Sequence, residues 1–208
     1  MSNITENTHQ GDNSLYEKTP SHFNYAPLAV LYEYVKSLDT EHYHEVLKVL
    51  MDKAKLNDEV NKQIQGWEQE SPRSNRTRLV VKLINHTGQA LAVGENNLYL
   101  NANEQAFINI LPWDIKAFRF DFTYSRQLGS RSKDMFKHFI MFGDNNIGFR
   151  FDFGLRVNTS FGVISSTLTP IRTNKVTSFG TAPIQCSTRI THSASEEPYS
   201  FTVEITLA

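Results

Sequence analysis

The residues that most often carry catalysis or bind metals are few in this chain and widely spaced. Seven histidines and a single cysteine, Cys186, occur among its 208 residues. His42 and His44 are only two positions apart, which would place them on different faces of a helix. The lone thiol excludes an intrachain disulfide and a thiolate metal cluster. We therefore predict no metal site and no bound cofactor.

Catalytic sequence motifs are missing as well. The chain contains no Gly-x-Ser-x-Gly nucleophile motif, no phosphate-binding glycine loop and no His-Glu-x-x-His motif. Carboxylates are plentiful, but spacing in the sequence does not show whether two of them converge in space. We predict that the protein is not an enzyme and that it has no catalytic residues.

Aromatic and cationic residues between the predicted strands favour a different chemistry, the binding of a membrane or a surface ligand. Trp113 follows Pro112 in an inter-strand loop, where an amphipathic ring suits a membrane interface. A partly buried loop anchor is the alternative role for this residue. The predicted binding surface combines it with two tyrosines and with the cations of a polar loop over 125–134: Trp113, Tyr99, Tyr124, Arg126, Arg131 and Lys133.

Charge is distributed unevenly along the chain. Residues 1–72 contain six Lys/Arg and twelve Asp/Glu, whereas residues 73–208 contain fifteen and ten. The acidic part could dock on the basic part, or the basic part could face an anionic surface; ordinary solvated faces are the alternative. A net charge of +5 over the second region is low for a nucleic-acid-binding protein, so we predict no nucleic-acid partner.

The elements that position these residues begin after a polar arm. Residues 1–22 lack hydrophobic periodicity and are predicted to be mobile. Residues 23–72 are predicted to be helical, with one helix over 28–38 and another that starts at Asp39 or Thr40. Gly66 and the Ser71-Pro72 pair are predicted to end this helical region.

Each predicted helix has an apolar stripe. The second stripe runs from Tyr43 to Ala54, and a further series from Leu56 to Trp67 either continues that helix or forms a separate one. These stripes could pack on the rest of the protein or on each other, or they could mediate assembly of several copies. The residues predicted to act in assembly are Leu28, Leu31, Val35, Val46 and Leu50.

From residue 73 to residue 208 the pattern changes to alternating strands. One phrase occurs twice, 31 residues apart, as Phe118-Arg119-Phe120-Asp121-Phe122 and Phe149-Arg150-Phe151-Asp152-Phe153. Each copy places three rings on one face of a strand, so we predict two central strands with cross-strand ion pairs on the opposite face. The turn sequence over 143–146 predicts a hairpin that pairs the second copy with residues 136–142.

Further short strands are predicted on both sides of the repeated phrase. Two predicted strands, over 115–124 and 147–157, contain the copies of the phrase, and the others cover residues 79–84, 90–93, 98–100, 107–111, 162–168, 175–179, 184–191 and 199–207. The strand over 184–191 is expected to point Ile184, Cys186, Thr188 and Ile190 inward. Many short strands without intervening helices predict a mainly β protein, an antiparallel β-sandwich preceded by an N-terminal helical segment, α+β as a whole.

Three segments carry a resemblance to a known family. They are Arg78-Leu79-Val80-Val81-Lys82-Leu83-Ile84-Asn85-His86-Thr87-Gly88, the hairpin Gly143-Asp144-Asn145-Asn146-Ile147-Gly148-Phe149, and Phe201-Thr202-Val203-Glu204-Ile205. Residues 78–208 resemble the β-sandwich of actinoporin-like and aegerolysin-like cytolysins. The resemblance implies membrane binding and pore formation. Residues 154–161 lack the aromatic lipid-headgroup cluster of actinoporins, and the helices here are longer and acidic.

These observations lead to one functional hypothesis and two alternatives. We expect a non-enzymatic, cytolysin-like β-sandwich that binds a membrane or surface ligand, with pore formation as a further expectation and the acidic helical segment controlling engagement or assembly. The alternatives are a structural protein whose helices mediate homo-oligomeric assembly and a carbohydrate-binding module for surface glycans. The polar N-terminal residues and the lack of a long apolar run predict synthesis in the cytoplasm, with release by a non-classical route left open.

Overall fold

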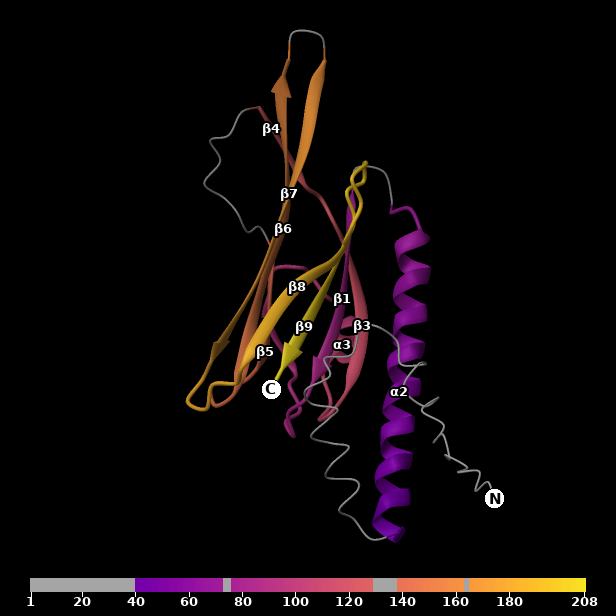
Figure 1. The fold of residues 1–208 in the computed structure, drawn as a ribbon. Coiled ribbons are helices and arrows are strands. Elements are labelled where there is room, and N and C mark those ends of the chain that lie inside the picture. The colour runs from indigo at the N-terminus through magenta and orange to yellow at the C-terminus, as the bar shows by residue number, and fades with distance from the viewer. Residues whose placement is uncertain (1–39, 73–75, 129–137, 163–164) are drawn as a thin grey trace, which may run out of the picture. The chain divides into compact units, whose positions relative to one another are not determined.

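The computed structural model describes residues 40–72, 76–128, 138–162 and 165–208. In these residues the protein is mainly β, with two sheets arranged as a sandwich and a helix before them (Figure 1), which confirms the predicted fold class. The chain divides into the units Met1–Lys53 and Ala54–Ala208. The predicted arm over 1–22 and the helix over 28–38, with Leu28, Leu31 and Val35, lie outside the described residues.

Helix α2 (Thr40–Gln69) is a single helix of 30 residues. It begins where the sequence predicted, and the second apolar series continues it without a break. The helix ends at Gln69, just before the Ser71-Pro72 pair as predicted, but it runs through Gly66, so the prediction that Gly66 ends it is wrong. One glycine costs a helix only about 1 kcal/mol, and Trp67, the next residue, is held by packing against the β-sheet.

The first sheet has the order β3-β1-β9-β8. Its strands are β1 (Thr77–Asn85), β3 (Ile115–Phe122), β8 (Cys186–Ser193) and β9 (Phe201–Leu207). β1 pairs with β3 antiparallel and with β9 parallel. The first copy of the repeated phrase therefore lies on an edge strand, β3, and the prediction of a central strand is wrong for this copy. On β8, Ile190 is exposed and not inward as predicted, and a register irregularity follows it.

The second sheet is built around β6 (Gly148–Phe161), the strand with the second copy of the phrase. β5 (His138–Gly143) pairs with the first part of one β6 edge and β4 (Ser125–Leu128) pairs parallel with the later part. β7 (Ser166–Phe179) pairs with the other edge over the whole length of β6, and β2 (Val93–Asn96) lies outside β5. The predicted hairpin between β5 and β6 is confirmed.

The two copies of the phrase meet in the core between the sheets. All six of their phenylalanine rings are buried. Phe122 contacts Phe153 edge to face, with ring centroids 5.4 Å apart, and Phe151 stacks on Phe153 at 5.1 Å. The alternating rings of the repeated phrase therefore form the centre of the sandwich, as the strand periodicity predicted.

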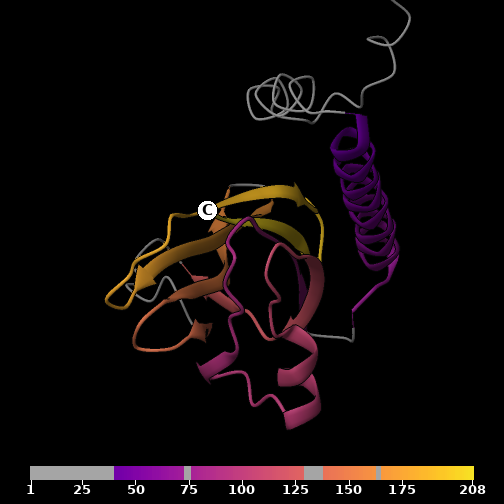
Figure 2. The same ribbon diagram turned by 90° about the horizontal axis from the view of Figure 1, so that it is seen from below.

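A short helix, α3 (Ala102–Ile108), replaces part of the strand that was predicted over 107–111. Asn101 and Glu104 form a capping box, in which each side chain accepts a hydrogen bond from the other residue's backbone N–H. The predicted strand over 98–100 is absent, and Leu91 makes only an isolated bridge to Ile110. The end view in Figure 2 shows α3 at the margin of the β domain.

Strand β7 also differs from the prediction. Two strands, over 162–168 and 175–179, were expected because Pro170 was interpreted as a stop, but one strand runs through it. Gly162 donates its N–H to the carbonyl oxygen of Ser165, so these two residues form a hydrogen-bonded pair. From this pair onward, hydrogen-bonded and non-hydrogen-bonded pairs alternate along β6 and β7. By this alternation Pro170 occupies a position whose backbone nitrogen points away from β6. A proline can occupy this edge position without loss of a ladder hydrogen bond.

Candidate functional site

The residues predicted to form one binding surface lie at opposite ends of β3. Trp113 comes two residues before this strand, and Tyr124 comes two residues after it. A strand of eight residues is roughly 26 Å long. The structure therefore does not bring Trp113 and Tyr124 together, and the two residues belong to separate surfaces at opposite ends of the domain.

Trp113 and Tyr99 belong to the connection between β2 and β3, residues 97–114, which we call the aromatic connection. Tyr99 is 98% exposed and Trp113 is 56% exposed. Both have positive φ angles, 55° and 57°, which bulky residues rarely adopt. Phe107 and Leu111 are also exposed in this connection. It presents an unusual concentration of apolar side chains to the solvent.

Buried and half-buried polar side chains hold the backbone of the aromatic connection. The buried amide of Asn85 donates to the carbonyl oxygens of Gln89 and Leu111, at 2.9 and 2.8 Å. The ammonium of Lys116 donates to the carbonyl oxygens of Phe107 and Asn109, at 2.8 and 2.7 Å. These contacts fix the loop and leave its rings facing outward.

Tyr124 lies at the other end of the domain, where it supports the loop before β9. Its hydroxyl is hydrogen-bonded to the carboxylate of Glu197, and its ring contacts that of Tyr199 edge to face at 5.9 Å. Arg126 is part of β4, opposite Val157 of β6, but its side chain is outside the described residues. Arg131 and Lys133 lie outside them entirely.

At this same end, the paired strands β6 and β7 extend beyond the first sheet (Figure 1). We call residues 157–162 and 165–171 the hairpin end. The core-facing side of β6 is buried through Phe153, Leu155 and Val157 and then reaches Phe161, which is 75% exposed. Leu168, opposite Thr159 on β7, is exposed as well. The apolar side of β6 and β7 thus continues beyond the point at which the first sheet covers it.

The hairpin end has no charged residue. Fifteen consecutive residues, 157–171, separate Arg156 from Arg172, and the two arginines occupy neighbouring rungs of the ladder. The Arg172 guanidinium donates to the carbonyl oxygens of Tyr199, at 3.3 Å, and of Ala194. Burial lowers the pKa of Arg172 from its usual range, although it stays charged at neutral pH. The base of the hairpin end is therefore fixed to the rest of the domain.

No protein-family model and no curated protein matches this chain. The remaining candidate surfaces are the contact of α2 with the first sheet and the pocket beside it.

The second half of α2 packs on the outer face of the first sheet. Val60 and Ile64 are buried against Val80 of β1 and Ala117 of β3. Leu56 and Trp67 flank this cluster, which gives the later apolar stripe of the helix a structural role. Of the predicted assembly residues, Val46 and Leu50 lie in the first half of α2 and are half-buried.

Arg78 of β1 ties the end of α2 to this sheet. Its guanidinium, whose residue is only 5% exposed, forms a two-point salt bridge with Asp121 on β3, at 2.8 and 3.0 Å. It also donates to the carbonyl oxygens of Trp67 and Glu70, at 3.3 and 3.2 Å. The last turn of α2 has no basic residue of its own, so Arg78 supplies the cation that its carbonyl groups favour.

Glu70 completes this network. Its carboxylate accepts from Arg78 at 3.1 Å and also from Arg119, whose guanidinium lies 5.3 Å from the centre of the Trp67 ring. The hydrogen bond that Arg119 donates is the main cause that lowers the pKa of Glu70, and the hydrogen bond that Arg78 donates to Asp121 is the main cause that raises the pKa of Arg78. The network acts as a structural joint between the end of α2 and the first sheet.

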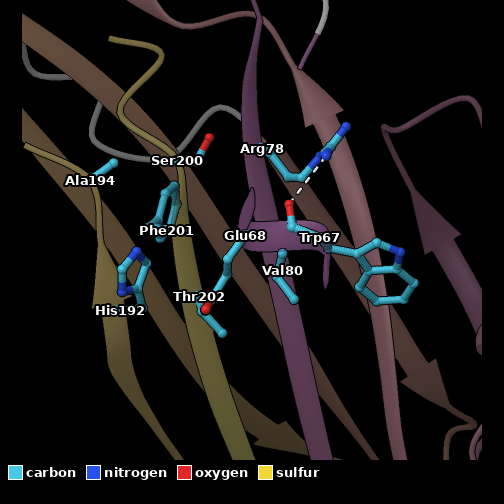
Figure 3. A pocket seen from close by; sticks show the side chains of 9 residues that line it. All are labelled: Trp67, Glu68, Arg78, Val80, His192, Ala194, Ser200, Phe201 and Thr202. Atoms are coloured by element: carbon cyan, nitrogen blue, oxygen red, sulfur yellow. Dashed lines mark hydrogen bonds between the residues drawn. The ribbon is translucent and has the colours of Figure 1, made fainter. Parts of the chain in front are cut away.

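A pocket next to this joint is lined by residues of α2, β1, β8 and β9, among them Glu68, His192 and Thr202 (Figure 3). Its cavity volume of about 30 Å³ suffices for a water molecule but not for a cofactor or a metabolite. In the residues that the structure describes, no group of three or more His, Cys, Asp or Glu side chains is arranged to bind a metal. None of the helices described is both long and apolar enough to cross a bilayer.

The hairpin end was missed in the sequence because Pro170 appeared to end a strand. A signal was nevertheless present, since residues 157–171 are the uncharged stretch between two arginines and are rich in Ser and Thr. In a protein with 21% charged residues, such a stretch indicates a segment that does not depend on charged side chains for its contact with water.

Proposed function

We propose that the β domain is a non-enzymatic module that binds a membrane surface through the hairpin end. The observation that carries the proposal is the exposure of Phe161 at the end of an uncharged extension of the core-facing side of β6. An apolar side chain on a charge-free strand end enters the acyl boundary of a bilayer at little cost, whereas a charged residue would not.

Charge around the base of the hairpin end favours the same partner. Arg156 and Arg172 stand at its base, and Arg126 of β4 pairs in register with Val157 of β6. Cations next to an apolar segment attract the phosphate groups of a membrane surface, at about 1 kcal/mol for each one near an anionic leaflet. The proposal also draws on the resemblance of β1, the β5–β6 hairpin and β9 to cytolysin strands.

The length of the hairpin end sets the depth of insertion. Its arms of five and six residues, 157–161 and 166–171, span roughly 17–20 Å at 3.3 Å per residue, against a hydrocarbon core of about 30 Å. The hairpin end therefore anchors in one leaflet and does not cross the bilayer by itself. We expect binding without leakage of vesicle contents, and leakage would indicate that pore formation involves further segments.

Vesicle flotation tests this function. Full-length protein is mixed with phosphatidylcholine vesicles, with or without phosphatidylserine, and the bound fraction is measured at low and high salt. Phe161→Ala is expected to reduce binding at least about tenfold, because a buried phenylalanine ring contributes roughly 2 kcal/mol. Phe107→Ala, which removes an exposed ring at the aromatic connection, is the matched control and should bind like the wild type. If Phe107→Ala loses binding and Phe161→Ala retains it, the hairpin end is not the membrane site.

The aromatic connection favours a second candidate function, the binding of a surface glycan. Exposed rings stack on the apolar faces of sugars, and the strained backbone at Tyr99 and Trp113 holds two rings outward. A glycan array with full-length protein tests this candidate. Retention that Tyr99→Ala and Trp113→Ala abolish, while Phe161→Ala leaves it unchanged, would support it; absence of retention would exclude it.

A further inference from the structure

The first half of α2 carries an apolar stripe of its own. At about 100° per residue, its members fall within roughly 100° of the helix circumference. They are Tyr43, Val46, Leu47 and Leu50. Charged side chains occupy the opposite side of the helix, at positions 41, 45, 48 and 52. In the part of the chain that the structure describes, the cluster that holds α2 on the first sheet starts only at Leu56, so it does not include this stripe.

Exposure differs between the stripe and the sides of the helix next to it. Val46 lies in the stripe and is half-buried, whereas Val49 lies outside it and is 58% exposed. Leu50 and Met51 differ in the same way, since Leu50 is half-buried and Met51 is 65% exposed. The two valines have the same side chain in the same helix, so the difference in their exposure indicates a neighbour that lies along the stripe.

Other contacts indicate that this neighbour belongs to the same chain. His42 and Lys53 lie on one flank of the stripe, and both already interact with other groups of the chain. The chain divides inside α2, and the unit Met1–Lys53 contains the first half of the helix. The stripe therefore belongs to a unit formed with residues 1–39, and its neighbour should come from those residues.

The sequence directly before α2 supplies a second apolar stripe. Its members recur at spacings of three and four and are Leu28, Leu31, Val35 and Leu38. If one helix ran straight through Asp39, the two stripes would lie roughly 90° apart around its axis. A break at Asp39, a favoured N-cap residue for α2, allows the stripes to face each other. Helices joined by a short connection are usually antiparallel neighbours.

An antiparallel arrangement also matches the two stripes residue by residue. Residues at equal distances from Asp39 along the chain then lie side by side. The resulting apolar pairs are Val35 with Tyr43, Leu31 with Leu47, and Leu28 with Leu50. The first stripe starts at Leu28, so the contact ends at the level of Leu50, close to the boundary of the unit at Lys53.

We infer that residues 28–38 form a helix that folds back on the first half of α2 and covers its apolar stripe. The two stripes supply the contact, and the break at Asp39 sets the antiparallel direction. The surface thus binds the N-terminal segment of its own chain. This inference goes beyond membrane binding and does not depend on it, since the residues that it uses are not part of the hairpin end.

Disulfide formation in full-length protein gives the first test, in a Cys186→Ser background. Leu31→Cys combined with Leu47→Cys is expected to form a disulfide within one molecule on oxidation at low protein concentration, because packed helices bring facing Cα atoms within the roughly 7 Å that the bond allows. Leu31→Cys combined with Lys48→Cys is the matched control. It should stay reduced, since position 48 lies on the charged side of α2.

Thiol labelling gives the second test, in the same background. Leu50→Cys should react with a maleimide at least about tenfold more slowly than Met51→Cys, because the covering helix must open first. Leu31→Glu should remove this difference, since it places a charge in the centre of the contact. Ala29→Glu adds the same side chain on the other side of the predicted helix and should preserve the difference. Circular dichroism checks that the variants keep their helix content.

Equal labelling rates for Leu50→Cys and Met51→Cys would overturn the inference, because the stripe would then be open to solvent. A disulfide between positions 31 and 47 that forms only between two molecules would also overturn it and assign the surface to a second copy. Slow labelling of Leu50→Cys without any disulfide between positions 31 and 47 would show that another segment covers the stripe. Equal disulfide yields for the Leu47 and Lys48 pairs would contradict the predicted contact face.

Discussion

Phe120 of β3 and Phe153 of β6 stack across the sandwich, with ring centroids 5.7 Å apart and planes inclined by 14°. They come from the two copies of one repeated phrase, at its third position and its fifth. The repeat therefore forms the contact between the two sheets, where each copy buries the rings of the other. Its role is to hold the hairpin end at one end of the domain and the aromatic connection at the other.

Phe153→Ala is expected to destabilise the protein by about 3–5 kcal/mol, because it removes a fully buried ring that contacts four other rings. Phe161→Ala is the matched control, since it lies on the same side of the same strand but is exposed, and it should change the free energy of unfolding by less than about 0.5 kcal/mol. Urea unfolding measures both. A large loss in Phe161→Ala would mean that its ring is part of the core.

Arg78→Ala is expected to destabilise the protein by about 3 kcal/mol, because it leaves Asp121 without its partner and the last carbonyl groups of α2 without a donor. Arg150→Ala is the control. It removes the pair between Arg150 and Asp152, at 2.9 Å on a single strand, and this more exposed pair should contribute no more than about 1 kcal/mol. Equal losses in the two variants would contradict the structural role given to Arg78.

The attachment of the α2 end is expected to weaken in acid. The pKa of Glu70 is lowered in the folded protein. The stability that its carboxylate contributes is therefore fully present above the ordinary pKa of a glutamate and is lost as the pH falls through the lower pKa of the folded state. Fluorescence of Trp67 in a Trp113→Phe background follows this contact between pH 7 and about pH 3. Glu70→Gln should remove the transition from the titration. Persistence of the same transition in Glu70→Gln would assign it to another group.

Pro170→Thr is expected to promote self-association through the open edge of β7, because it restores a backbone donor in the middle of that edge. In the described residues β7 pairs only with β6, and an open edge of this length can recruit another strand. The measurement is sedimentation velocity of the variant beside the wild type. Pro183→Thr, in the loop before β8, is the control and should stay monomeric. No difference between the two variants would show that Pro170 does not protect the edge.

Local signals in the sequence were sufficient for some elements and not for others. The β5–β6 hairpin could be predicted because Asp144 both follows a turn glycine and accepts the N–H groups of Asn146 and Ile147, at 2.8 and 3.0 Å. Helix α3 was missed, although its capping box was readable as Asn101 followed three residues later by Glu104. There the apolar run after Phe107 favours a strand and competes with the cap signal.

The candidate site shows a different limit. Trp113 and Tyr124 were grouped because both are aromatic residues in loops, but the loops before and after one strand must lie at opposite ends of it. Strand direction alone could therefore have separated them. The exposure of Phe161 could not be predicted, because it depends on where the first sheet stops, and that in turn depends on pairings between distant segments.

The position of β9 between β1 and β8 has a consequence for how the protein is made. Leu79 pairs with Phe201, which is 122 residues later in the chain. At translation rates of about 5–20 residues per second, the inner edge of β1 stays unpaired for roughly 6–24 s after it is synthesised. During this interval the nascent chain can pair wrongly through that open edge. A chaperone that occupies the edge until β9 has been synthesised should therefore raise the yield of folded protein more than one that acts after release.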